Sequence, residues 1–105
     1  MKKLIFNYNN KAFTDSTIIA EGAGVEHKAV IQLIKNHYND VSEFGKVAFQ
    51  MIPSPNSTTG RKIKVYQLNE QQATFVILLM KNTKPVVTFK KELIKQFHFI
   101  ELLGG

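Results

Sequence analysis

Hydrogen-bond donors gather on one face of the segment GVEHKAVIQLIKNHYND, which covers residues 24–40. Its apolar residues recur at helical spacing and predict an amphipathic helix over 26–39. Off the apolar stripe, with no acid between Glu26 and Asp40, lie two lysines and two amides: Lys28, Gln32, Lys35 and Asn36. An amide can pair with adenine through two hydrogen bonds, and a lysine can bind guanine or phosphate. Alternatively, this face is the solvated side of an ordinary surface helix.

His27 stands at the start of this predicted helix. In a helix that enters a DNA groove, the first residues reach the bases and the phosphates first. His27 can therefore donate to a phosphate or to a base edge. It can equally be a structural histidine that is hydrogen-bonded to the preceding glycine turn, and the sequence leaves both roles open.

Further cations flank a long polar loop. The stretch GKVAFQM alternates apolar residues (Val47, Phe49 and Met51) with others, IPSPNSTTGRK collects turn-forming residues, and RKIKVYQL alternates again. These stretches predict a β-hairpin over 45–68, a wing, whose tip and outer face hold Arg61, Lys62 and Lys64. Such a hairpin can bind phosphates and release their counterions. Alternatively, its lysines protect an exposed sheet edge from aggregation.

The remaining segments must position these two groups. LIFNYNNKAF predicts a small N-terminal hairpin that turns at Asn9–Asn10. TDSTIIAEGAG predicts a short helix with a cap among residues 14–16 and a stop at Gly22 and Gly24. NEQQATFVILLMKN predicts a buried helix capped by Asn69, and the last stretch of the chain predicts a final helix.

The resulting order is hairpin, helix, helix, basic hairpin, helix, helix. This order indicates an α+β fold of the winged helix-turn-helix type, in a single domain over 1–105. In such a domain the helix at 26–39 enters the major groove and the wing at 45–68 lies on phosphates. We therefore expect double-stranded DNA as the partner.

The last predicted helix carries an apolar stripe that is wider than a small monomer needs, formed by Phe89, Leu93, Phe97 and Ile100. The stripe predicts a homodimer through this helix, or the docking of a further C-terminal segment. It also supports a rival interpretation, an antirepressor-like module that neutralises another regulator by binding it. Structured RNA is a third partner to consider, although no exposed aromatic platform for bases is evident from the sequence.

The composition favours a polyanionic partner. Among 105 residues, 14 are Lys or Arg and 8 are Asp or Glu, which gives a net charge of +6. Nucleic acid fits this charge best and an anionic membrane surface second, although basic charge can also serve solubility alone. The chain has no cysteine, no histidine pair at metal-binding spacing and no nucleotide-binding or nucleophile motif, so we expect no enzyme, metal, cofactor or small-molecule substrate. No signal peptide or membrane-spanning run is visible, so we expect a cytoplasmic protein that does not bind a membrane.

Three stretches resemble the Rha family of phage regulatory proteins, over residues 12–101. TDSTIIAE…GVEHKAVIQLI is similar to the family's T-S-x-x-I/V-A-E … H-x-x-V-x-x-x-I pattern, with His27, Val30 and Ile34 in register. GRKIKVYQLNEQQATFVILLM and FKKELIKQFHFIE resemble its glycine-basic turn, strand, apolar helix and closing helix. The resemblance implies a phage or prophage regulator with an N-terminal DNA-binding region, acting in the bacterial host cell.

Two departures from the family pattern stand out. PSPNSTT replaces the tyrosine-containing segment that commonly precedes the glycine-basic turn. The chain also stops at Gly105 without a second domain, so we expect either a short member or a piece of a longer protein.

Overall fold

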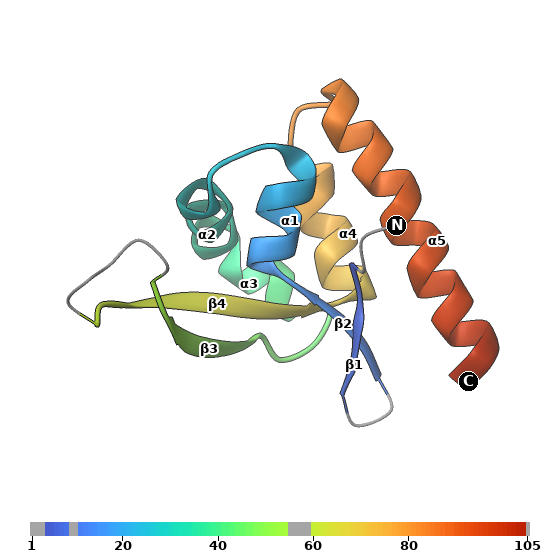
Figure 1. The fold of residues 1–105 in the computed structure, drawn as a ribbon, viewed down its shortest axis with the longest axis horizontal. Coiled ribbons are helices and arrows are strands. Elements are labelled where there is room, and N and C mark those ends of the chain that lie inside the picture. The colour runs from blue at the N-terminus through green and yellow to red at the C-terminus, as the bar shows by residue number, and fades with distance from the viewer. Residues whose placement is uncertain (1–3, 9–10, 55–59, 105) are drawn as a thin grey trace.

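The computed structural model describes residues 4–8, 11–54 and 60–104, without the side chains of Tyr8 and of residues 99–104. Within these residues the chain forms an α+β fold, as predicted, with a four-stranded antiparallel sheet in the order β1-β2-β4-β3 and five helices. Figure 1 shows α1, α2, α3 and α4 on one side of the long β3–β4 pair. The elements are β1 (Phe6–Tyr8), β2 (Lys11–Asp15), α1 (Ser16–Ala23), α2 (His27–Asn36), α3 (Tyr38–Ser42), β3 (Ala48–Pro53), β4 (Lys62–Asn69), α4 (Glu70–Leu78) and α5 (Lys84–Gly104).

Both predicted hairpins are present, and they share one sheet. β1 and β2 pair with Tyr8 opposite Lys11, and the predicted turn at Asn9–Asn10 lies outside the described residues. β2 also pairs with the end of β4, with Phe13 opposite Asn69. The N-terminal hairpin therefore extends the sheet of the wing, which we define here as the β3–β4 hairpin.

The helix α1 begins and ends as its local sequence requires, except at one glycine. Asp15 caps it, because its side chain accepts a hydrogen bond of 2.9 Å from the backbone N–H of Ile18. Gly24 ends it in the left-handed region, at φ 71°. The prediction that Gly22 also stops the helix was wrong. Gly22 lies within α1, where a Cβ atom would overlap the ring of Phe89.

The predicted helix over 26–39 ends earlier than expected, and a third helix precedes the wing. α2 stops at Asn36, because His37 leaves the helical region at φ −119° and ψ 28°. α3 then begins at Tyr38, whose ring centroid lies 6.5 Å from that of Tyr66 on the wing. Helical spacing alone could not reveal this break, since Tyr38 follows Ile34 by four residues in either case.

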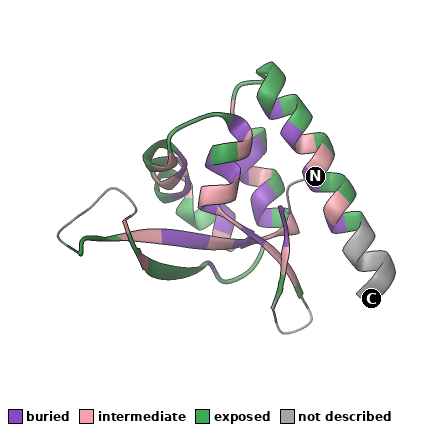
Figure 2. Ribbon diagram, viewed as in Figure 1, coloured by how far each residue is buried: buried purple, intermediate pink, exposed green. Residues whose placement is uncertain are grey.

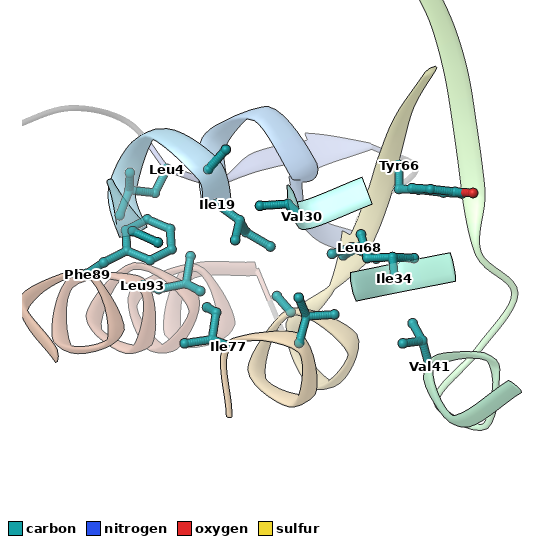
Figure 3. Packing of buried hydrophobic residues seen from close by; sticks show 14 of the residues in the cluster. Leu4, Ile19, Val30, Ile34, Val41, Tyr66, Leu68, Ile77, Phe89 and Leu93 are labelled. Atoms are coloured by element: carbon teal, nitrogen blue, oxygen red, sulfur yellow. The ribbon is translucent and has the colours of Figure 1, made fainter. Parts of the chain in front are cut away.

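A single hydrophobic cluster joins the sheet to the helices. Figure 3 shows Val30 and Ile34 of α2 beside Leu68 of β4, and Figure 2 shows the buried residues on the facing sides of the helices. The predicted cap of α4 is confirmed as a capping box between Asn69 and Gln72. Gln72 also donates a 2.7 Å hydrogen bond to the carbonyl oxygen of Gly45, so α4 holds the segment that leads into the wing.

The apolar stripe of α5 packs inside the chain. Phe89, Leu93 and Phe97 are at most 5% exposed and belong to the same cluster as α1 and α4. These three side chains are therefore not a free surface for a second copy, contrary to the predicted dimer face. The side chain of Ile100 lies outside the described residues. The formation of a homodimer itself stays a prediction.

Candidate nucleic-acid interface

The helix α2 exposes its polar face because its apolar face is occupied by the core. Val30 and Ile34 are buried, at 1% and 0% exposure. Four of the five predicted contact residues on α2 are exposed: Lys28, Gln32, Lys35 and Asn36. They are spaced by four, three and one residues, so they lie on one side of the helix. Their role in DNA binding stays a prediction.

Two amides on this face are coupled. The Nε2 of Gln32 donates a 2.9 Å hydrogen bond to the Oδ1 of Asn36, one turn further along α2. This bond uses one of the two hydrogens on Gln32 Nε2 and leaves its Oε1 as an acceptor. The arrangement orients the Gln32 amide while keeping one donor and one acceptor, which is what adenine requires.

The cation at the start of the face has an acidic neighbour. The Nζ of Lys28 lies 3.6 Å from the Oε2 of Glu26, and both side chains are largely exposed. An ion pair in such a solvated position contributes little stability, at most about 1 kcal/mol. A phosphate could therefore replace Glu26 as the partner of Lys28 at small cost.

His27 is hydrogen-bonded to a residue of another helix. Its Nε2 lies 2.8 Å from the hydroxyl oxygen of Ser16, the first residue of α1. The same oxygen accepts a 3.0 Å hydrogen bond from the backbone N–H of Tyr66 in β4. The Ser16 hydroxyl still has its proton and a second lone pair, so it can donate to an unprotonated Nε2 of His27 or accept from a protonated one, according to the ring tautomer.

This contact bears on the two roles that the sequence left open for His27. His27 has a structural contact, but its partner is Ser16 and not the glycine turn that the sequence left open as one alternative. Burial lowers the pKa of His27 from its ordinary value of 6.5, against the opposing attraction of Asp15. A neutral, half-buried ring is poorly placed to attract a phosphate, although the histidine positions the start of α2.

The predicted cations of the wing differ in their surroundings. Arg61 and Lys62 are exposed at the distal end of the hairpin, next to Gly60. Lys64 is half-buried, and its Nζ lies 4.5 Å from the centroid of the Phe49 ring. β4 pairs with β2 only at residues 67–69, so its distal part also has an open edge. Protection of that edge therefore remains an alternative role for the lysines.

The structure also contains a site that sequence analysis missed. We call Phe49, Lys64, Tyr66 and Tyr38 the aromatic–cation cluster, because the Nζ of Lys64 lies near two of its rings and each ring lies beside another. The alternating pattern in the sequence placed Val47 and Phe49 on one apolar face. In the structure Val47 is buried, whereas Phe49 is 54% exposed. Phe49 lies near the base of the wing, opposite Tyr66, on the edge strand β3, most of which is exposed (Figure 2). The cross-strand pairing of Phe49 with Tyr66 was the available signal, once the register is known.

The helix and the wing lie toward the same end of the molecule. The longest axis is horizontal in Figure 1, where α2 and the distal part of the wing occupy one end and α5 occupies the other. The two groups of cations predicted from the sequence are therefore brought to one end of the fold. A position at one end of the fold is necessary, but not by itself sufficient, for both groups to contact a single polyanion.

Within the described residues, no three His, Asp or Glu side chains come together as a set of metal ligands. No described helix combines the length and the apolar character needed to span a membrane.

Comparison with known proteins places the chain in a family. Residues 14–101 match the family model described as phage regulatory protein Rha. No curated protein and no solved structure shows significant similarity to the chain.

Proposed function

Since the chain belongs to the family of phage regulatory protein Rha, we propose that it is a winged helix-turn-helix regulator that binds double-stranded DNA in the bacterial host cell. The regulatory role follows from the family. The binding mode is inferred from the surface described above.

One observation carries the proposal: an exposed, donor-rich face on α2 and an exposed basic wing occur at the same end of the fold. A helix fits the major groove, which is about 12 Å wide, and a neighbouring hairpin can then reach the flanking phosphates. The net charge of +6 favours the encounter with DNA.

The residues divide into those that read bases and those that hold the backbone. Gln32, oriented by Asn36, is placed to recognise adenine in the major groove. Lys28 and Lys35 bind guanine or phosphate on either side of it. Arg61 and Lys62 neutralise phosphates from the wing, a contact that carries no sequence information. His27 acts indirectly, by holding the start of α2 against Ser16.

Selection of bound duplexes from a random oligonucleotide pool tests this function directly. We expect an enriched motif, and we expect its affinity to fall steeply as salt concentration rises, because each neutralised phosphate adds about 0.9 to the slope of the log–log plot. A two-fold symmetric motif would indicate binding as a dimer. Absence of any enriched duplex together with salt-insensitive duplex binding would contradict the proposal.

The rival function is a protein-interaction module of the antirepressor type. The aromatic stripe first considered for it is buried, but Leu78 of α4 and Ile94 of α5 are exposed large apolar residues that line a shared hollow. This surface would bind a regulator with little dependence on salt. Substituting Leu78 and Ile94 with Ser separates the functions, because DNA binding should be unchanged and an antirepressor contact should be lost.

A further inference from the structure

The aromatic–cation cluster on the wing has an unusual combination of exposure and order. The ring of Phe49 is 6.5 Å from that of Tyr66 and inclined at 71°, so the two meet edge to face. The Nζ of Lys64 lies 4.5 Å from the centroid of Phe49 and 5.6 Å from that of Tyr66. Phe49 nevertheless remains 54% exposed. It is an apolar side chain held in place at the surface.

The surroundings of Phe49 are also apolar and exposed. Met51, two residues further along β3 and opposite Lys64, is 49% exposed. Tyr38 of α3 is 42% exposed and stands 6.5 Å from Tyr66 on the side of the helices. The patch therefore runs from the junction of α2 and α3 onto the wing, beside the proposed DNA-binding helix.

The charge of the wing identifies the partner. The sequence from Phe44 to Asn69 contains four cations (Lys46, Arg61, Lys62 and Lys64) and no acid. A partner must therefore combine flat apolar faces with negative charge, which is the chemistry of nucleobases on a phosphate backbone. A second copy of the chain that docked by the same patch would bring Lys62 and Lys64 against their own counterparts.

We propose that the aromatic–cation cluster binds an unstacked nucleobase, with the ring of Phe49 against the base and the ammonium group of Lys64 near the adjoining phosphate. This inference rests on the proposed function for the class of partner, nucleic acid. The inference goes beyond the proposed function, because the wing then contacts bases as well as phosphates. In a duplex the contact requires a base step to open, and in a single strand the base is already available.

A pair of short single-stranded oligonucleotides tests the site without a duplex. One is made of thymidines and the other of abasic residues with the same number of phosphates. We expect the wild-type chain to bind the thymidine strand about tenfold more tightly. Phe49→Leu, which keeps an apolar side chain, should abolish this preference, and Phe49→Trp should retain it. Phe44→Ala is the matched control, since Phe44 is an exposed phenylalanine that packs on Phe75 instead.

Each outcome has a defined meaning. Equal binding of both strands by the wild-type chain, or a preference that survives Phe49→Leu, overturns the inference. Sedimentation that shows a dimer dependent on Phe49 also overturns it, in favour of a second copy on this patch. A thymidine preference that depends on Phe49, in a chain that selects no duplex, retains the base site and contradicts the proposed duplex regulator.

Discussion

The hydroxyl oxygen of Ser16 lies 2.8 Å from the Nε2 of His27, eleven residues further along the chain, and 3.0 Å from the backbone nitrogen of Tyr66. Ser16 is the first residue of α1, His27 is the first of α2, and Tyr66 lies in β4. One buried hydroxyl group therefore connects the proposed recognition helix to the wing. Ser16 and His27 both fall within the stretches that resemble the Rha pattern. The hydrogen bond between them gives these two residues a structural role.

Replacing Ser16 with Ala should destabilise the fold. The backbone N–H of Tyr66 would lose the hydroxyl oxygen of Ser16 as its acceptor in a buried position, at a cost of about 1–3 kcal/mol. Urea denaturation measures this change as a lower midpoint at unchanged slope. Ser42→Ala is the control, because the Ser42 hydroxyl donates to the carbonyl of Tyr38 in an exposed position and its loss should change stability by no more than about 0.5 kcal/mol. Equal losses of stability in Ser16→Ala and Ser42→Ala would show that the buried contact of Ser16 contributes no more than the exposed one of Ser42.

The stability of the fold should depend on pH through His27. Burial lowers the pKa of this residue in the folded chain, so the unfolded chain takes up the proton first as the pH falls below 6.5. The stabilising contribution is therefore complete above that pH and is lost on acidification toward the folded pKa. Denaturation midpoints at about pH 8 and about pH 5.5 should differ more for the wild-type chain than for His27→Gln.

The glutamine variant isolates this effect, because its side-chain amide can still hydrogen-bond to Ser16 but does not titrate. All other ionisable groups remain in both proteins and cancel in the comparison. An identical loss of stability on acidification in both proteins would mean that His27 does not contribute.

Substituting Gly22 with Ala should destabilise the chain, although alanine favours a helix. A Cβ at this position meets the ring of Phe89, which is only 5% exposed and has little room to move. Overpacking of this kind costs about 1–3 kcal/mol, against about 1 kcal/mol gained in helix propensity. Thermal denaturation should show a lower midpoint.

A double-mutant cycle verifies the origin of that change. If the clash with Phe89 is the cause, Gly22→Ala should be less harmful, or stabilising, in a Phe89→Leu background. Additive effects would place the cause elsewhere.

Lys62→Ala should weaken duplex binding in a way that salt reveals. Loss of one phosphate contact lowers the slope of log affinity against log salt by about 0.9. Lys91→Ala is the matched control, since Lys91 is exposed on α5 at the opposite end of the molecule and should leave the slope unchanged. The same slope for Lys62→Ala and the wild-type chain would remove the wing from the interface.

Lys64→Ala is expected to do more than lower the salt slope by a similar amount. The ammonium group of Lys64 also lies over the rings of Phe49 and Tyr66, so its loss removes a cation–π contact that orders the wing. Its substitution should reduce the affinity at every salt concentration, which the same titration measures.

Local chemistry was sufficient to predict most elements from the sequence. The Asn69 cap, the glycine stop at Gly24 and the alternation of the wing strands each depend on residues within a few positions of one another. Such short-range preferences act before any tertiary contact forms. The exposed face of α2 could also be predicted from local spacing, because a helical period places Lys28 and Gln32 opposite Val30.

Tertiary packing decided the rest, because it depends on which surfaces meet. The stripe at Phe89 was predicted to meet a partner, and the approach of α5 to Gly22 instead made it part of the core. The contact between His27 and Ser16 depends on how α1 and α2 turn about Gly24. Phe49 is exposed because it lies on β3, the edge strand of the sheet, most of which is left uncovered. Residue types and spacing thus specified the elements and their polar faces, whereas burial and contact arose only when those elements packed together.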